Sequence, residues 1–335
     1  MDMNAEPLRV RHKRWKAAAA GFMGLVAGAM LPACSADVPD SESDSLDFAT
    51  LSVPRSSRSA LPVRESYQAR DGRRLYYRRY ASDSDTWLVL IHGSATDSVY
   101  LRYFARSLAR AGAAQVITPD LRGHGPSPAH RGDIAYVDQL EDDLADLVSH
   151  LDAGGDIPSR VVIGGHSSGG GMALRFGGSR YGDRADGYLL LAPYLGHDAP
   201  TARENAGGWA EPNLTRIVPI AFLDALGIDW FNGVDVLHFN MPPEYRTGSE
   251  TLDYSYRLMK GFAPTDYAAN LSAIQAPILL LAGAADEAFR SGHYGPAMTP
   301  HAPAADVELL EGVSHLELMV SDRAVDRVAR WLAQL

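Results

Sequence analysis

The sequence has almost no cysteine, and this scarcity excludes two ways of stabilising a small domain. Among 335 residues there is one cysteine, Cys34. A single thiol cannot form an internal disulfide, and no Cys/His pattern has the spacing of a zinc finger. The formal net charge is −10, so a folded protein of this composition lacks the basic surface with which proteins bind nucleic acid. We therefore expect no disulfide framework, no structural zinc and no nucleic-acid partner.

Long apolar runs are also scarce, and the notable one lies near the N-terminus. Residues 17–31 carry no charge and follow a basic cluster that ends at Lys16. This run is too short for a membrane-spanning helix and has the length of the hydrophobic region of a signal peptide. It ends in Leu31-Pro32-Ala33-Cys34, which resembles the bacterial lipoprotein signal, where cleavage precedes a cysteine that becomes lipidated.

These features predict an exported lipoprotein of the cell envelope, held to a membrane by a lipid anchor at Cys34. Residues 1–33 would be the signal peptide. Pro32 is unusual in such a signal, and a plain secretory signal, giving a soluble secreted or periplasmic protein, is the alternative. Residues 34–60 contain too few apolar side chains to offset the entropy of ordering, so we predict a flexible tether there.

Apolar material is plentiful in the rest of the chain. Hydrophobic residues make up 46% and charged residues 21% of the sequence, as in an ordinary globular protein. From residue 61 onward, short apolar runs alternate with helical patterns. Strands are predicted at residues 87–91, 115–118, 161–163, 187–192, 277–282 and 307–311, and helices at 100–111, about 140–151 and 322–335. This alternation predicts an α/β fold with a mostly parallel sheet covered on both faces.

One segment at the end of a predicted strand has the pattern of a nucleophile elbow. Gly165-His166-Ser167-Ser168-Gly169 fits G-x-S-x-G, in which a tight turn between strand and helix lifts a serine hydroxyl clear of the sheet. The turn leaves almost no room for side chains two positions before and after the serine. Ser168 is in the wrong register, because position 166 would then have to be glycine. We therefore identify Ser167 as the candidate nucleophile; a Gly/Ser loop between strand and helix, of the kind that can bind a phosphate, is the alternative.

Five motifs, taken in their order along the chain, resemble those of the α/β-hydrolase superfamily. Within that superfamily they are most similar to the monoacylglycerol lipase and lysophospholipase-like branch, which is of serine aminopeptidase S33 type. They are His92-Gly93, Asp120-Leu121-Arg122-Gly123-His124-Gly125-Pro126-Ser127, the elbow, Gly283-Ala284-Ala285-Asp286 and Gly312-Val313-Ser314-His315. The resemblance covers about residues 64–335. It implies an eight-stranded, mostly parallel sheet in a domain at 61–335, with a helical cap inserted at about 194–262. It also implies that no cofactor is needed.

The resemblance assigns the roles of a serine hydrolase. Ser167 would be activated by His315, and Asp286 would orient the imidazole, in the order Ser, Asp, His expected of this fold. Glu287 would take the role of Asp286 if the loop were shifted. The backbone amides of Ser94 and Ser168 would form the oxyanion hole.

Other polar groups have plainer interpretations. A metal role for His124 and His166 is weaker than a structural one, so no metal is predicted. The acidic residues of the helix near 140–151 are expected to form a solvated face; they are Glu141, Asp142, Asp143 and Asp146.

The leading functional prediction is a serine hydrolase that cleaves lipid-like or other acyl esters through an acyl-enzyme. The expected partners are a small-molecule acyl ester and, through Cys34, a membrane; no obligate protein partner is evident. A peptidase of the proline-iminopeptidase type would use the same triad. A non-catalytic binding protein on this fold is a third possibility, against which the intact triad argues.

Overall fold

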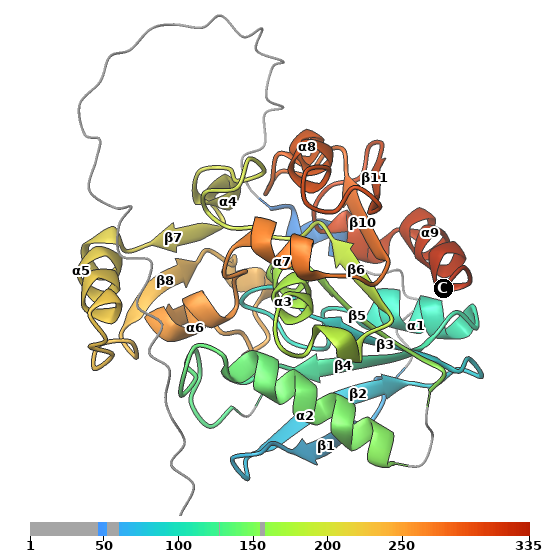
Figure 1. Ribbon diagram of the computed structural model, residues 1–335, viewed down its shortest axis with the longest axis horizontal. Helices are drawn as coiled ribbons and strands as arrows, with labels where there is room; N and C mark the ends of the chain where they lie inside the picture. The colour runs from blue at the N-terminus through green and yellow to red at the C-terminus, as the bar shows by residue number, and fades with distance from the viewer. Residues whose placement is uncertain (1–45, 52–59, 127, 155–157) are drawn as a thin grey trace, which may run out of the picture. The chain divides into compact units, whose positions relative to one another are not determined.

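The computed structural model describes residues 46–51, 60–126, 128–154 and 158–335 (Figure 1). The predicted signal peptide, Cys34 and most of the predicted tether lie outside the described residues, and so does Ser127. In the part of the chain that is described, no helix is long and apolar enough to cross a membrane.

Eight strands form one mixed sheet in the order β1-β2-β4-β3-β5-β6-β10-β11. β1 and β2 form an antiparallel hairpin, β2 is antiparallel to β4, and all later neighbours are parallel. The strands are Arg64–Gln68 (β1), Arg74–Tyr80 (β2), Thr86–Ile91 (β3), Gln115–Asp120 (β4), Arg160–His166 (β5), Gly187–Leu191 (β6), Ile278–Gly283 (β10) and Asp306–Leu310 (β11). This confirms the predicted eight-stranded, mostly parallel sheet.

The central strands are apolar on both faces because helices cover both. Every residue of β3, β6 and β10 is buried. α1 packs against α9, whereas α3 packs against α2 and α7, so that the helices form two groups around the sheet. The helices are Arg102–Arg110 (α1), Gln139–Ala153 (α2), Ser168–Gly177 (α3), Tyr267–Ala273 (α7), Tyr294–Met298 (α8) and Asp322–Leu332 (α9), and short 3-10 turns occur at Gly182–Arg184 (η3), Ser291–His293 (η5) and Glu317–Val320 (η6).

The acidic face of α2 is not solvated, and the expectation for it was wrong. Glu141, Asp142 and Asp143 are buried and pair with arginines from other elements. The closest nitrogen–oxygen distances are 3.1 Å from Arg175 to Glu141, 2.8 Å from Arg70 to Asp142 and 2.7 Å from Arg122 to Asp143. The helical pattern of leucines correctly locates α2, but it gives no information on the arginines that approach from distant parts of the chain.

The insertion between β6 and β10 contains a second, small sheet beside its helices. β7, β8 and β9 form three antiparallel strands, which the sequence did not predict because they are only three to five residues long. The elements of this cap are Asn205–Gly208 (α4), Ala210–Pro212 (β7), Leu214–Ala225 (α5), Asp235–Phe239 (β8), Pro243–Tyr245 (η4), Asp253–Ser255 (β9) and Tyr256–Gly261 (α6). The expected helical cap is therefore a mixed one.

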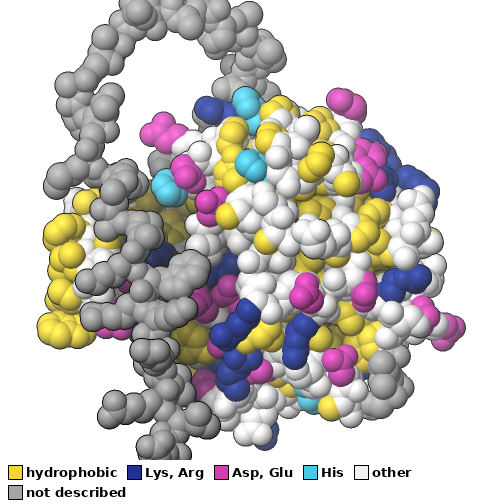
Figure 2. Space-filling model, in the orientation of Figure 1, with side chains coloured by type: hydrophobic (Ala, Val, Ile, Leu, Met, Phe, Trp, Pro, Cys, Tyr) yellow, Lys and Arg dark blue, Asp and Glu magenta, His cyan; other side chains and the backbone are white. Residues whose placement is uncertain are grey.

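The outer side of α5 carries exposed apolar side chains at four-residue spacing. Leu214, Val218, Phe222 and Leu226 are each more than 60% exposed, and Trp230 just beyond the helix is 84% exposed. Residues four apart lie on the same side of a helix, so these side chains form one stripe. Figure 2 shows hydrophobic side chains gathered at this edge of the cap.

Part of the predicted tether is an ordered turn. Phe48–Leu51 form the 3-10 turn η1, which lies against η6. The prediction of a free tether over residues 34–60 is therefore too broad at this point. Leu46, Phe48 and Leu51 supply apolar side chains to this short stretch, and all three pack on the hydrophobic core.

Candidate active site

Ser167 sits in a strained turn between β5 and α3. Its backbone has φ 57° and ψ −123°, in a region that residues other than glycine rarely adopt. A Cβ atom on Gly165 would lie 2.2 Å from the carbonyl oxygen of Gly169, and one on Gly169 would lie 2.3 Å from that of Ile91. The steric need for glycine on both sides of the serine is thus confirmed.

Asp286 and His315 follow neighbouring strands, β10 and β11, and are hydrogen-bonded to each other. The distance from His315 Nδ1 to Asp286 Oδ2 is 2.9 Å, and both side chains are buried. The other carboxylate oxygen of Asp286 accepts the backbone amides of Ala288 at 2.9 Å and Phe289 at 2.8 Å. With Nδ1–H donating to the carboxylate, the Nε2 lone pair of His315 is available to take a proton.

The surroundings of His315 favour its protonated form. Burial by itself lowers the pKa of this imidazole, but the charge and hydrogen bond of Asp286 and the charge of Glu287 raise it above its ordinary value of 6.5. The group therefore combines a free nitrogen with an increased affinity for protons. These are the properties of a general base.

Ser167 lies at the same end of the sheet, and its side chain is 8% exposed. The ring of the preceding residue, His166, has its centroid 4.5 Å from that of His315. No hydrogen bond joins the Ser167 hydroxyl to another described residue. Such contacts are often long without substrate and tighten in the complex. The structure thus joins Asp286 to His315 directly and places Ser167 at the same end of the sheet, next to His166, which contacts His315.

Glu287, the alternative to Asp286, has a different contact. Its Oε2 accepts the backbone amide of His315 at 2.9 Å, and no hydrogen bond from Glu287 to the imidazole ring occurs in the described residues. Glu287 therefore fixes the loop that carries His315, whereas Asp286 holds the ring.

The two amides expected to form an oxyanion hole flank Ser167. Ser168 is the first residue of α3, where backbone amides have no partner within the helix. Ser94 follows β3, and a Cβ atom on its neighbour Gly93 would lie 3.4 Å from Ser167 Cβ. Neither amide donates a hydrogen bond to another described residue. Both are therefore available to an oxygen anion beside Ser167, and the positive end of the α3 dipole favours such an anion.

A hydrogen-bond chain between the main domain and the cap holds the Ser94 loop, and the sequence did not indicate it. The Tyr254 hydroxyl, from β9, accepts the Ala95 amide at 2.9 Å and contacts His124 Nε2 at 2.6 Å. His124 Nδ1 in turn lies 3.1 Å from the Arg122 carbonyl. Burial lowers the pKa of His124 well below its ordinary value, so the ring is neutral and accepts the tyrosine proton. Trp209 of the cap adds a further bond, donating to Ser94 Oγ at 3.1 Å.

His166 also has a structural contact. Its Nδ1 lies 2.8 Å from the Tyr100 hydroxyl, and its Nε2 lies 3.1 Å from the carbonyl of His315. Burial lowers the pKa of His166 well below its ordinary value, so the neutral ring accepts from Tyr100 and donates to His315. His166 and His124 each have both ring nitrogens occupied. Among the described residues, no three His, Cys, Asp or Glu side chains converge as a metal site.

Comparison with known proteins establishes the class. Residues 82–318 match the hydrolase family described as serine aminopeptidase S33, and the chain belongs to this family. The fold is that of the α/β-hydrolases. It resembles a soluble variant of monoglyceride lipase from Saccharomyces cerevisiae with a TM-score of 0.63 at 16% identity, covering 84% of this chain and 98% of that chain. An α/β-hydrolase from Penicillium is similar, with a TM-score of 0.57 at 16% identity over 81% of this chain and 99% of that chain.

Two curated relatives are similar over part of their length. The sn-1-specific diacylglycerol lipase of Danio rerio is 34% identical over 119 residues, 36% of this chain and 32% of that protein. The monoacylglycerol lipase of Mycolicibacterium smegmatis is 30% identical over 165 residues, 48% of this chain and 57% of that protein. The chain thus spans about a third of the first relative and somewhat over half of the second.

Proposed function

We propose that this protein is a serine hydrolase that cleaves carboxylic esters with lipid-like acyl groups through an acyl-enzyme. One observation carries the proposal: a buried aspartate–histidine pair and a serine held in a strained elbow follow strands that end on the same edge of the sheet. A serine hydroxyl is a weak nucleophile and needs such a base. The lipase names of the curated relatives support the same reaction class.

The proposed steps follow from the positions of the side chains. Ser167 Oγ attacks the ester carbonyl carbon as its proton passes to His315 Nε2, and Asp286 stabilises the imidazolium that forms. The amides of Ser94 and Ser168 hold the oxygen that becomes negatively charged. His315 then gives its proton to the departing alcohol, leaving the acyl group on Ser167. A water molecule gives a proton to His315 Nε2 and attacks the acyl carbon; the bond from that carbon to Ser167 Oγ then breaks, His315 returns the proton to Oγ, and the acid leaves.

The cap supports a lipid-like substrate. The stripe of Leu214, Val218, Phe222 and Leu226 on α5 faces solvent, where a patch of large apolar residues is costly without a use. A helix with such a side can lie in the interface of a lipid aggregate. The same edge of the protein would then meet the phase in which long-chain esters are dissolved.

We also propose that Cys34 carries the lipid anchor and that the protein is exported to the cell envelope. The support is the uncharged run at residues 17–31 ending in Leu31-Pro32-Ala33-Cys34. Cell fractionation tests this: wild-type protein should sediment with membranes, and Cys34→Ser should move to the soluble fraction. Equal sedimentation of both proteins would contradict the anchor.

The description of the matching family as serine aminopeptidase favours one alternative bond, the peptide amide next to an N-terminal residue. Such a peptidase would use the same Ser167, His315 and Asp286. Competition between a p-nitrophenyl ester and an aminoacyl p-nitroanilide distinguishes the two. Preference for the anilide in kcat/KM would replace esters by peptides as the substrate class.

The proposal is tested with Ser167→Ala, using soluble p-nitrophenyl esters and a fluorophosphonate probe. We expect turnover to fall by about 10⁴-fold or more, and labelling to be lost. Ser272→Ala is the control, because this exposed serine of α7 only bonds a carbonyl of its own helix. Undiminished turnover by Ser167→Ala, or a wild-type protein that the probe does not label, would overturn the proposal.

A further inference from the structure

The turn η1 comes from outside the matched family region, which begins at residue 82, yet it packs on the catalytic domain. Asp47 fixes its shape: the side chain accepts the Ala49 amide at 2.9 Å, and the carbonyl accepts the Thr50 hydroxyl at 2.7 Å. These local bonds give a defined conformation to a short segment. The turn therefore has a conformation set by its own residues.

Phe48 is the residue by which η1 contacts the cap. Phe48 is buried, with only 7% of its surface exposed. The ring centroid lies 5.3 Å from that of Trp209 and 5.5 Å from that of Tyr245, distances at which aromatic rings attract. Two cap residues thus enclose a ring that comes from the N-terminal segment.

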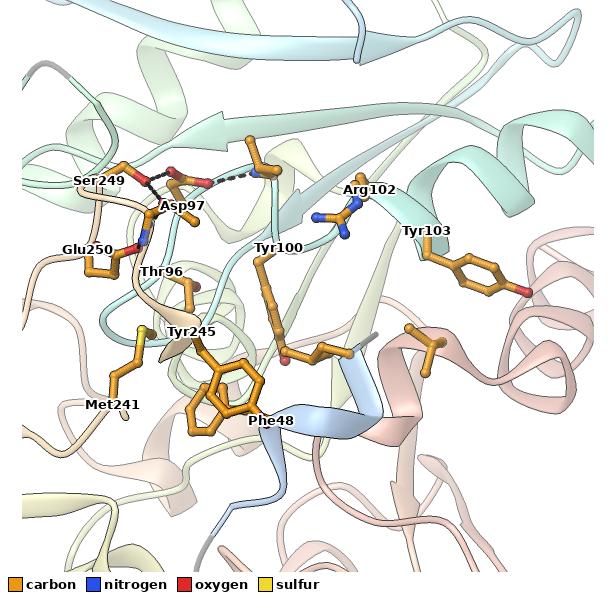
Figure 3. Close-up of a pocket in the computed structure, with 14 residues that line it drawn as sticks. Phe48, Thr96, Asp97, Tyr100, Arg102, Tyr103, Met241, Tyr245, Ser249 and Glu250 are labelled. Carbon is orange, nitrogen blue, oxygen red and sulfur yellow. Dashed lines mark hydrogen bonds between the residues drawn. The ribbon is translucent and has the colours of Figure 1, made fainter. Parts of the chain in front are cut away.

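Phe48 also lines a cavity of about 390 Å³ (Figure 3). That volume is within the range of small-molecule sites. Four separate segments form the walls: η1, the loop before α1, the chain around η4 and the end of η6. The apolar part of the lining consists mainly of Phe48, Leu51, Tyr100, Met241, Tyr245 and Val320.

The cavity adjoins the proposed active site. Thr96, in its wall, donates to the Gly93 carbonyl at 3.0 Å, and Gly93 lies against Ser167. Tyr100, also in the wall, contacts His166 next to Ser167 at 2.8 Å. Trp209 contacts Phe48 and also bonds Ser94. Residues of the cavity wall thus contact the loops on both sides of Ser167.

A second contact joins η1 to the loop of the proposed base. The Asp47 amide donates to Glu287 Oε1 at 3.4 Å, while Glu287 Oε2 accepts the His315 amide at 2.9 Å. One carboxylate thus holds both segments. η1 is fixed to the main domain through Glu287 and to the cap through Phe48.

We propose that η1 is a wall of the acyl-chain cavity and that Phe48 limits the length of the chain that fits. This inference rests on the proposed ester hydrolase function and makes chain-length selection depend on residues that precede the family region. A smaller side chain at position 48 extends the cavity toward solvent and admits longer chains. A larger one shortens it.

The experiment compares full-length wild-type protein, Phe48→Ala and Phe48→Trp on soluble p-nitrophenyl butyrate and decanoate. We expect Phe48→Ala to raise the decanoate-to-butyrate ratio of kcat/KM by about tenfold, and Phe48→Trp to lower it by a similar factor. Val63→Ala, which truncates an apolar side chain that is 83% exposed and lies outside the cap before β1, is the control and should leave the ratio at its wild-type value. Phe48→Leu serves as a further small-residue variant if thermal unfolding shows that Phe48→Ala is not folded.

The results distinguish a failure of the Phe48 proposal from a failure of the esterase proposal. Active variants with wild-type chain-length ratios would overturn the role of Phe48 and leave the esterase proposal intact. A wild-type protein that hydrolyses neither ester would overturn the esterase proposal, and the acyl-chain cavity with it.

Discussion

At the residue scale, the protonation and the position of His315 depend on two adjacent carboxylates that make different contacts. Asp286 bonds the ring and Glu287 bonds the backbone amide, at 2.9 Å in each case. The ring partner sets the tautomer and opposes the effect of burial on the pKa. The backbone partner, Glu287, fixes the position of the loop and adds a smaller charge effect that also raises the pKa. Adjacent acidic residues can therefore differ greatly in their effect on the reaction.

This difference leads to a prediction about pH. A general base must be neutral, so kcat/KM should fall as His315 becomes protonated on the acid side. Because the pKa of His315 is raised above its ordinary value, the inflection should lie above about 6.5. Asp286→Asn removes the charge that raises this pKa, so the inflection should move to lower pH, and kcat should fall by about 10³- to 10⁴-fold.

The measurement is a pH profile of kcat/KM on a soluble ester for wild type, Asp286→Asn and Glu287→Gln. Glu287→Gln is the matched variant, since an amide oxygen can still accept the His315 backbone amide. It should cost less than about tenfold in kcat. A larger loss in Glu287→Gln than in Asp286→Asn would reverse the two assignments.

At the element scale, the turn between β5 and α3 should tolerate no side chain in place of Gly165. The clashes of a Cβ atom at Gly165 are with the backbone of Gly169, which cannot rotate away. We expect Gly165→Ala to destabilise the protein by about 4 kcal/mol or more, or to prevent folding. Urea unfolding followed by circular dichroism measures this.

Gly292→Ala is the control for the elbow, because nothing lies within 4 Å of the Cβ atom that it would add. It should change the free energy of unfolding by no more than about 0.5 kcal/mol. A wild-type unfolding midpoint in Gly165→Ala would mean that the elbow can relax, and the steric explanation would be wrong.

Whether a strand or helix could be predicted from the sequence depends on what stabilises it. β3, β6 and β10 are continuous apolar runs because both faces are covered, so the sequence alone reveals them. β7 and β9 have three residues each and depend on their partners for stability, which leaves no periodic signal. The turn η1 was not predicted for the same reason, because it packs on Trp209 and Tyr245, which lie far along the chain.

The residues of the candidate site also fall into those that a local motif predicts and those that only the fold reveals. Ser167, Asp286 and His315 were found because each stands in a local motif at a strand end, and their roles stay a prediction. Tyr254 and Trp209, which bond the Ser94 loop, were missed. Their contacts span 159 and 115 residues of sequence, and no motif marks either one. Residues that act through long-range contacts in the fold have no local signature.

At the scale of the whole molecule, the exposed stripe on α5 gives the protein a side suited to a lipid surface. Replacing Phe222 and Leu226 by serine removes apolar area without disturbing the core, since both are more than 60% exposed. We expect binding to phosphatidylcholine vesicles to weaken by about a hundredfold, because each of the two side chains loses roughly 1.5 kcal/mol of transfer energy if it is fully buried in lipid.

Vesicle flotation measures the binding, and hydrolysis of a soluble short-chain ester in the same preparations is the control. The variant should keep the wild-type rate on that ester. Vesicle binding equal to that of wild type would show that the stripe has no contact with lipid.

The place of β11 at the edge of the sheet has a consequence for biogenesis. β11 pairs with β10 alone, and His315 follows it. A chain still being synthesised contains Ser167 and Asp286 before it contains His315. Under the proposed mechanism, the base is in place only after this last strand docks, so hydrolysis cannot begin before β11 has folded onto β10.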